Sequence, residues 1–489
     1  MNTPWHYQSA REIRDAVRSG AASATAMTEW HLDRIAEVDP LVDAFTQVWR
    51  DEALAQAAAV DEKARRGDAL GPLAGVPVGL KELLCTRTGT TSCASKILKD
   101  FRSPYDGTVV KRMAAADAVF LGKVNMDEFA MGSSTERSTI KVTRNPWNLK
   151  CVPGGSSGGS AAAVSAGECA ISLGSDTGGS IRQPAAMCGC VGIKPTYGRV
   201  SRYGLVAFAS SLDQIGPLTR TVEDAALTLN VICGRDPLDS TSADLPAEDF
   251  TAALTGDVRG LRIGLPAEYF TDALNTEMRE KVEAAVDVFR REGAEIVPVS
   301  LPHANYAIAV YYIICTAEAS ANLARFDGVR YGFRHPAAKS VEEMYVLTKS
   351  EGFGPEVKRR IMLGTYVLSS GYYDAYYLKA QKVRRLIKRD FDEAFEKCDV
   401  IAGPTSPIPS FEFGTKTDNP LEMYLADIYT ISTNLATLPG ISIPCGLTAS
   451  GLPAGLQMMA RPFNEAALLR AAHCHEQKSG VRLGEPPVA

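Results

Sequence analysis

The sequence predicts an α/β fold in which helices cover both faces of a central sheet. Short apolar runs bounded by glycine and proline predict buried strands, and longer amphipathic segments between them predict helices. The clearest unit is the strand–helix–strand pattern of 262–266, 276–293 and 295–299. Alternation of this kind is typical of a layered α/β domain.

Length and composition are consistent with one large domain. The chain has 489 residues, of which 45% are hydrophobic and 22% are charged. These values are ordinary for a globular protein, and the length is sufficient to bury a large core. There is no internal repeat and no long linker. We therefore predict one domain over 1–489, with a core at about 71–235 and a mainly helical segment at about 305–397.

Charge and cysteine usage narrow the class of protein. The net charge of −5 gives no general argument for nucleic-acid binding. The N-terminal residues do not resemble a secretory signal, and no apolar run is long enough to span a membrane. The eleven cysteines include no C-x-x-C pair. This predicts reduced thiols in the cytoplasm and argues against a zinc site.

The N-terminal elements are predicted in order from caps and apolar patterns. Ser9 caps a first helix that runs through Arg18 and ends at Gly20, and Ser23 caps a second. The apolar side of the second helix is expected to comprise Met27, Trp30, Leu32 and Ile35. A third helix is expected at 52–66, followed by strands at 76–80 and 118–121.

The later elements alternate in the same way. After a helix at 222–233 and a polar loop at 236–249, the strand–helix–strand unit begins. Beyond the helical segment, further strands are expected at 400–403, 440–444 and 455–459, and helices at 419–438 and 464–480.

The stretch 151–199 contains the most informative pattern. The clusters GGSSGGS (154–160) and SDTGGS (175–180) are separated by a predicted helix at 161–166 and a strand at 170–173. A further helix is expected after Ser180. Both serine clusters then lie at helix N-termini, where free N–H groups favour negative charge. Glycines beside a serine leave its hydroxyl accessible, which suits a nucleophile with an oxyanion hole.

This stretch has three other interpretations. A flexible Gly/Ser linker is disfavoured because the intervening segments are apolar. A phosphate-binding loop is disfavoured because the G-x-x-x-x-G-K-[ST] pattern is absent. A Ser–His–Asp triad stays open, although none of the six histidines lies in the Gly/Ser stretch or in a companion motif.

Lys81 directly follows the predicted strand at 76–80. Most lysines are solvated, and a solvated role is the simple alternative. A lysine at the end of a buried strand is desolvated, however, and desolvation can make it a neutral base near pH 7. A Ser–Lys arrangement is therefore the favoured chemistry.

These motifs resemble the amidase-signature family of serine hydrolases. The resemblance extends to NMDEFAMGSSTE at 125–136 and to the segments 197–221, 322–332 and 356–384. Within that family it is closest to the glutaminase subunits of tRNA-dependent amidotransferases. The resemblance implies a single domain with a mixed β-sheet core.

The resemblance also implies roles for individual residues. The proposed relay runs from Lys81, the base, through Ser156, the bridging serine, to Ser180, the nucleophile, with a cis peptide bond at the bridging serine. The oxyanion hole would be formed by the backbone at Thr177, Gly178 and Gly179. Glutamine would be bound by Tyr311, Arg360 and Asp427. Asp176 and Arg182 are expected to form a pair that stabilises the loop 175–180, which we call the nucleophile loop. Ser157 and Ser160 are expected to serve as cap or network residues.

Two departures from the family pattern qualify the resemblance. Glu82 and Leu83 follow the lysine where relatives usually have a small acidic or amide residue, so the hydrogen bonds around Lys81 can differ. The residues 137–142 also depart from the usual small, polar continuation. No chemistry is assigned to the acidic residues of 125–136.

The implied function is glutamine hydrolysis through a glutamyl-enzyme ester. The ammonia would convert Glu-tRNA(Gln), Asp-tRNA(Asn) or both in a heterotrimer with the B and C subunits of the amidotransferase. ATP, Mg²⁺ and most tRNA contacts are expected on the B subunit, with no cofactor, metal or membrane contact in this chain. The alternatives are a stand-alone amidase for a small aliphatic or aryl amide, and a non-catalytic scaffold or tRNA-binding module. The acidic balance and the presence of Lys81, Ser156 and Ser180 disfavour the last.

Overall fold

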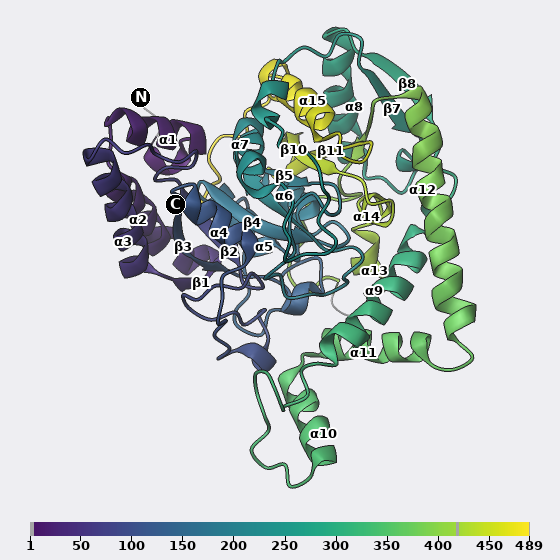
Figure 1. Ribbon diagram of the computed structural model, residues 1–489. Coiled ribbons are helices and arrows are strands. Elements are labelled where there is room, and N and C mark those ends of the chain that lie inside the picture. The colour runs from purple at the N-terminus through teal and green to yellow at the C-terminus, as the bar shows by residue number, and fades with distance from the viewer. Residues whose placement is uncertain (1–3, 417–419, 489) are drawn as a thin grey trace.

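The computed structural model describes residues 4–416 and 420–488 (Figure 1). Their eleven strands form one sheet in the order β1-β3-β2-β4-β6-β5-β10-β11-β9-β7-β8. The strands are β1 (Phe45–Val48), β2 (Pro77–Lys81), β3 (Val119–Val124), β4 (Ile171–Asp176), β5 (Val191–Lys194), β6 (Gln214–Thr219), β7 (Arg262–Pro266), β8 (Glu295–Val299), β9 (Val400–Pro404), β10 (Gly440–Leu447) and β11 (Pro453–Ala460).

The sheet is mixed, as the family resemblance implied. Strand β2 is parallel to both of its neighbours, β3 and β4, and β7 is parallel to β8 and β9. The remaining pairs are antiparallel. Because β2 and β4 run in the same direction, their carboxyl ends lie side by side at one edge of the sheet. Lys81 and Asp176 end these two strands.

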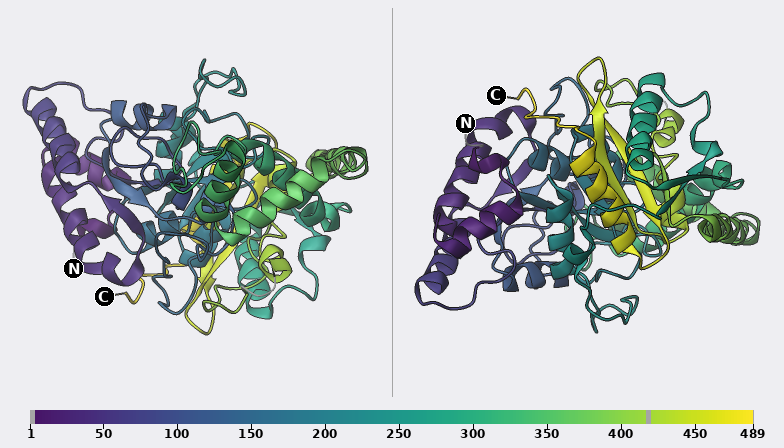
Figure 2. Two further views of the ribbon diagram at one scale, coloured as in Figure 1. Left: turned by 90° about the horizontal axis from the view of Figure 1, so that it is seen from below. Right: turned by 90° about the horizontal axis from the view of Figure 1, so that it is seen from above.

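Helices cover the sheet on both faces (Figures 1 and 2). Helices α5 and α6 pack against each other and the sheet, while α15 packs with α7 and α8. The helices are α1 (Ala10–Ser19), α2 (Ala24–Val42), α3 (Arg50–Arg65), α4 (Thr108–Ala115), α5 (Gly158–Ser165), α6 (Arg182–Cys188), α7 (Val222–Ile232), α8 (Thr276–Arg291), α9 (Ala307–Leu323), α10 (Val341–Gly352), α11 (Pro355–Leu368), α12 (Lys379–Lys397), α13 (Pro420–Leu425), α14 (Ile431–Leu435) and α15 (Glu465–Lys478).

The predicted N-terminal caps are present. Ser9 and Glu12 form a reciprocal capping box at the start of α1, and Gly20 ends that helix in the left-handed conformation. The Ser23 side chain caps α2. One detail of the prediction is wrong, because Trp30 on α2 is 49% exposed rather than part of the buried side.

The predicted unit at 262–299 is confirmed as β7, α8 and β8. The segment 305–397 is mainly helical, as predicted. It contains α9, α11 and α12, and α10 projects from the main body (Figure 1). A six-residue π-helix, Tyr373–Leu378, leads into α12. The expected helix at 464–480 is α15.

The predicted single helix at 419–438 is wrong over the described residues. The chain forms the short helices α13 and α14 instead, with a turn between them in which the amides of Thr430 and Ile431 both reach the Asp427 carbonyl. The Thr430 hydroxyl donates to the Gly178 carbonyl at 2.7 Å. The helix is therefore interrupted where its residues contact the nucleophile loop. Asn419 lies outside the described residues.

No helix within 4–416 or 420–488 combines the length and apolarity that a transmembrane span requires. All eleven cysteines are free thiols, and ten of them are buried.

Candidate active site

Lys81 lies at the carboxyl end of β2 and is fully buried. Its Nζ is hydrogen-bonded to three hydroxyl groups: Ser156 Oγ at 2.8 Å, Ser157 Oγ at 2.7 Å and Ser175 Oγ at 3.0 Å. It also approaches the Ser175 carbonyl at 3.4 Å. The lysine is therefore held among hydroxyls with no carboxylate in direct contact among the described residues.

Burial lowers the pKa of Lys81 to about 7. The negative charges of Asp127, Asp176 and Asp213 oppose this shift but do not cancel it. A large fraction of Lys81 is therefore neutral near pH 7, which a proton acceptor requires.

Glu82 does not pair with Lys81, although it is the next residue. Its carboxylate accepts hydrogen bonds from Gln47 Nε2 at 2.8 Å and from the Ser92 amide and hydroxyl at 3.0 and 2.8 Å. Thr46 Oγ1 donates to it at 2.5 Å. Glu82, the unusual residue after the lysine, thus anchors residues 46–47 and Ser92. The side chains that contact the Lys81 amine are serines.

Ser156 lies in the turn between Pro153 and α5, and the Gly155–Ser156 peptide bond is cis, as the resemblance implied. The turn is fixed from several sides. The Gly155 amide donates to Gln183 Oε1 at 2.9 Å, and Gly154 has a positive φ of 80° and allows the close approach of Gln183. Ser156 is fully buried and faces Lys81.

Ser180 lies at the end of the SDTGGS loop, just before α6, and is 8% exposed. Its carbonyl accepts a hydrogen bond from the Ser157 amide at 3.2 Å, which joins the two Gly/Ser clusters. Within the described residues the Ser156 and Ser180 side chains are not hydrogen-bonded to each other. Such contacts are often long before substrate binds.

The backbone of the nucleophile loop offers free donors. The Gly179 amide is already used, since it donates to Asp176 Oδ1 at 2.8 Å. The amides of Thr177, Gly178 and Ser180 have no acceptor among the described residues. Two of the three predicted oxyanion residues, Thr177 and Gly178, therefore keep a free N–H group. Because the Gly179 amide is already used, this geometry does not fit the prediction that Gly179 contributes to the oxyanion hole.

The expected pair of Asp176 and Arg182 is confirmed. Both side chains are fully buried and lie 3.0 Å apart. Burial opposes ionisation of Asp176, but the Arg182 guanidinium outweighs it and holds the Asp176 pKa at about 2. Arg182 also donates to Gln457 Oε1 and Asn434 Oδ1, so the loop is tied to β11 and α14.

Tyr311, Arg360 and Asp427 gather beside the nucleophile loop. Tyr311 on α9 packs over Gly178, where an added Cβ would lie 2.7 Å from its ring. Arg360 on α11 is 3% exposed and its charge acts on both Tyr311 and Asp427. Its Nε donates to Glu356 Oε1 at 2.8 Å, a partner that the sequence did not predict.

Asp427 places a buried carboxyl group beside the nucleophile loop. Burial raises its pKa to about 7, and Ser133 donates a short hydrogen bond to its Oδ2. Its Oδ1 is buried with no hydrogen-bond partner among the described residues. A buried acceptor without a partner is costly, so a ligand donor at this position is expected to bind favourably.

Sequence reasoning did not assign Ser157 and Ser175 to Lys81. Ser157 was predicted as a cap or network residue and belongs to the network, because its hydroxyl bonds Lys81 and the Ser175 carbonyl. Ser175 ends up beside Lys81 because β2 and β4 are parallel neighbours, a pairing that no local pattern specifies. No histidine is hydrogen-bonded to Lys81, Ser156 or Ser180 in the described part of the chain, so a Ser–His–Asp triad finds no support.

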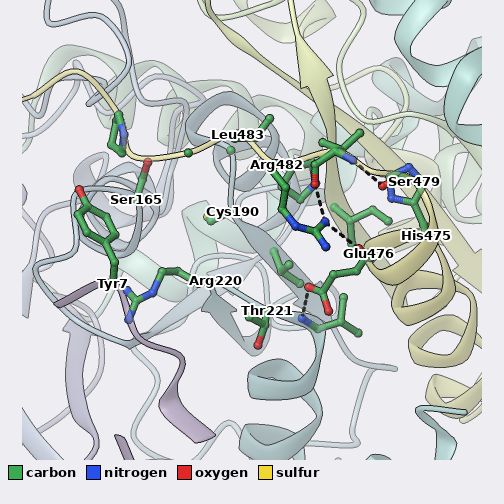
Figure 3. Close-up of a pocket in the computed structure, with 18 of the residues that line it drawn as sticks. Tyr7, Ser165, Cys190, Arg220, Thr221, His475, Glu476, Ser479, Arg482 and Leu483 are labelled. Carbon is green, nitrogen blue, oxygen red and sulfur yellow. Dashed lines mark hydrogen bonds between the residues drawn. The ribbon is translucent and has the colours of Figure 1, made fainter. Parts of the chain in front are cut away.

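Two further kinds of site, a metal centre and a surface cavity, were considered among the described residues. Within 4–416 and 420–488 no group of three or more His, Cys, Asp or Glu side chains could hold a metal ion. A cavity of about 380 Å³ is lined by Tyr7, Arg220, His475 and Arg482 among others (Figure 3). None of its lining residues is a predicted site residue, so we locate the chemistry at Lys81 and the serines instead.

Comparison with known proteins identifies the family of this chain. The Amidase family model matches residues 26–469. The A subunit of the glutamyl-tRNA(Gln) amidotransferase of Moorella thermoacetica is 58% identical, covering 98% of each chain. The crystal structure of the corresponding Thermotoga maritima protein has a TM-score of 0.83 at 41% identity, covering 100% of this chain and 99% of that one. A bacterial aryl acylamidase of the amidase-signature family gives 0.87 at 27% identity, covering 98% and 97%. This chain belongs to the amidase family.

Proposed function

We propose that this chain is the glutaminase subunit of a tRNA-dependent amidotransferase. The observation that carries the chemistry is the buried Lys81, which has a pKa near 7 and is hydrogen-bonded to Ser156. The choice of glutamine is supported by relatives named as A subunits of glutamyl-tRNA(Gln) amidotransferases, which are 54–58% identical over nearly the whole chain.

In the proposed reaction, Ser180 Oγ attacks the side-chain amide carbon of glutamine. Its proton passes to Ser156 while the Ser156 proton passes to neutral Lys81. The C–O bond forms as the carbonyl π electrons move to oxygen, and the free amides of Thr177, Gly178 and Ser180 would stabilise that oxyanion. Lys81 then returns the proton through Ser156 to the departing nitrogen, the C–N bond breaks, and ammonia leaves a glutamyl ester. Water hydrolyses this ester by the same proton path in reverse.

The pocket residues would recognise the amino-acid end of glutamine. Arg360 would bind the α-carboxylate through the guanidinium nitrogens that do not contact Glu356. Asp427 Oδ1 would accept from the α-ammonium group, and Tyr311 would line the pocket. The B and C subunits of the amidotransferase are the proposed partners, with ATP, Mg²⁺ and misacylated tRNA on the B subunit.

The deciding experiment is glutamine-dependent transamidation with the B and C subunits present, measured separately for Glu-tRNA(Gln) and Asp-tRNA(Asn). Product formation with either tRNA supports the proposal. The second candidate is a stand-alone amidase, which is favoured by the similarity to the aryl acylamidase structure. Rapid hydrolysis of aryl or aliphatic amides by the isolated chain, with no use of glutamine in the complex, would favour that candidate.

A further inference from the structure

Asp127 is a buried carboxylate that the proposed mechanism does not use. It lies in the segment 125–136, just after β3, and its exposed fraction is 0%. The Thr135 amide donates to its Oδ2 at 2.9 Å, and the Arg137 amide donates to its Oδ1 at 3.1 Å. The segment therefore folds around this side chain.

The same residue contacts the turn that carries Ser156. Its backbone N–H donates to the Ser156 carbonyl at 3.2 Å. Its carboxylate lies against Gly155, where an added Cβ would be 2.2 Å from Oδ2. Asp127 is thus in contact with both residues of the cis peptide bond.

Thr135 completes the attachment of the segment to this turn. Its hydroxyl donates to the Gly154 carbonyl at 2.8 Å and accepts from the Gly158 amide at 3.1 Å. The segment 125–136 therefore contacts the turn on both sides of Ser156 through Thr135, and at Ser156 itself through Asp127.

The charge of Asp127 acts on Lys81 and raises its pKa. Asp127 has no ion-pair partner in the described part of the chain. Among the charges that raise the Lys81 pKa, that of Asp127 has the largest effect. Of the other acidic groups, Asp176 is paired with Arg182, and Asp213 accepts hydrogen bonds from Thr177 and from backbone amides. The Cys93 thiol also acts on Lys81, and Glu136 on Asp127.

Asp127 is charged at neutral pH despite its burial. Burial raises its pKa to about 6, and the amides of Thr135 and Arg137 limit that rise. When Lys81 accepts a proton, the new ammonium is buried and needs a compensating charge. Asp127 and Asp213 both lack an ion-pair partner among the described residues, and of the two Asp127 has the larger effect on the Lys81 pKa.

We propose that Asp127 is a positioning residue for the Ser156–Lys81 proton relay. Its backbone holds Ser156, and its carboxylate stabilises the ammonium form of Lys81 that exists between attack by Ser180 and departure of the leaving group. This inference rests on the proposed role of Lys81 as the base.

The test measures labelling of Ser180 in the full chain with a fluorophosphonate, as a function of pH. In this reaction Ser180 Oγ displaces fluoride, so the rate reports activation of Ser180 without requiring glutamine. The wild-type rate is expected to rise with pH through the Lys81 pKa near 7. In Asp127→Asn the Lys81 pKa falls, so the rise moves to lower pH by about one unit. Because a weaker base transfers protons less readily, the plateau rate falls at least about tenfold.

Glu128→Gln is the matched control. Glu128 is the next residue and is also buried, but it accepts hydrogen bonds from Ser95 and from the Gly354 amide, away from the relay. The pH of the rise is expected to be the same in this variant as in the wild type. If Asp127→Asn fails to fold by circular dichroism, Asp127→Ser, which keeps a hydroxyl acceptor, is measured in its place.

The outcomes separate this inference from the proposed function. A folded Asp127 variant with an unmoved pH profile overturns the charge role of Asp127, whatever its plateau. If Lys81→Ala is labelled at the wild-type rate, Lys81 is not the base and the proposed relay is wrong. Loss of labelling in Lys81→Ala with a shifted profile in the Asp127 variant supports both.

Discussion

At the scale of single residues, the proposed role of Lys81 as a base depends on desolvation. An exposed lysine is protonated at neutral pH, and burial is the main cause that lowers the pKa of Lys81 to about 7. The sequence predicted this from one feature, a lysine directly after an apolar strand. Of its three serine partners, Ser156 was predicted from the family resemblance, whereas Ser157 and Ser175 were not, because no local pattern links them to Lys81.

The first prediction is that Lys81→Arg abolishes glutamine hydrolysis. Arginine keeps the positive charge but does not become neutral near pH 7, so it cannot accept the Ser156 proton. We expect a loss of about 10³-fold or more in kcat, close to that of Lys81→Ala, since nucleophile and base act as a unit. Steady-state ammonia release, with circular dichroism to confirm folding, checks this. Substantial activity in the arginine variant would exclude Lys81 as the base.

The second prediction concerns recognition of the substrate by Asp427. Only its ionised form can bind the ammonium group, and its pKa is about 7. Asp427 therefore becomes protonated as the pH falls below 7, and KM for glutamine should rise by up to about tenfold per pH unit. Asp427→Asn should raise KM by at least about tenfold and remove this dependence on Asp427, with a smaller effect on kcat. Unchanged KM in the variant would remove Asp427 from the glutamine site.

At the scale of elements, much of the architecture follows from local pattern, and the exceptions have physical causes. Caps, strand–helix alternation and the Gly/Ser clusters predicted most helices and eight of the strands. Strands β1, β5 and β6 were not predicted. β6 contains Gly216 and Pro217, residues that disfavour strands, and β5 contains Gly192, yet both are central in the sheet. Tertiary pairing decides these strands.

The interrupted helix at 419–438 has a related cause. A continuous helix would satisfy its own backbone, but it would not bring the Thr430 hydroxyl to the Gly178 carbonyl or Asp427 to Ser133. These contacts join residues more than 200 positions apart, and no local sequence pattern reports them. The candidate site residues were predicted from motifs and from the family resemblance, whereas the distant residues that hold them in place could be seen only in the fold.

The third prediction tests the nucleophile loop as an element. A Cβ at position 179 would lie 2.2 Å from Thr430 Oγ1, and Gly179 has a φ of 135°, which side chains rarely adopt. Gly179→Ala should therefore displace the loop and its free amides and lower kcat about 10²- to 10³-fold, the effect of losing an oxyanion donor. Gly260→Ala is the matched control, because that glycine also has a positive φ but nothing within 4 Å. Its kcat should equal that of the wild type, and equal losses in both variants would contradict the argument.

At the scale of the whole molecule, the sheet assembles the site from distant parts of the chain. Lys81 comes from β2, the serines from the segment between Pro153 and α6, and the pocket residues from α9, α11 and the turn before α14 (Figure 1). Each segment is anchored by buried polar contacts rather than by sequence proximity. The prediction of one domain over 1–489 stays a prediction, and a single cooperative unfolding transition would support it.

The last prediction separates the glutaminase from the rest of the complex. In the proposed division of labour, this chain releases ammonia and the B subunit consumes it at the activated tRNA ester. Ser180→Ala removes only the nucleophile, and the loop remains held by Asp176 and Arg182 at 3.0 Å. With the B and C subunits present, glutamine-dependent transamidation should be lost, whereas added ammonium salt should restore product at the wild-type ammonia-dependent rate. Size-exclusion chromatography of the variant complex controls for assembly. Loss of both activities in an intact complex would mean that Ser180 contributes to the synthetic step, and the proposed division of labour would be wrong.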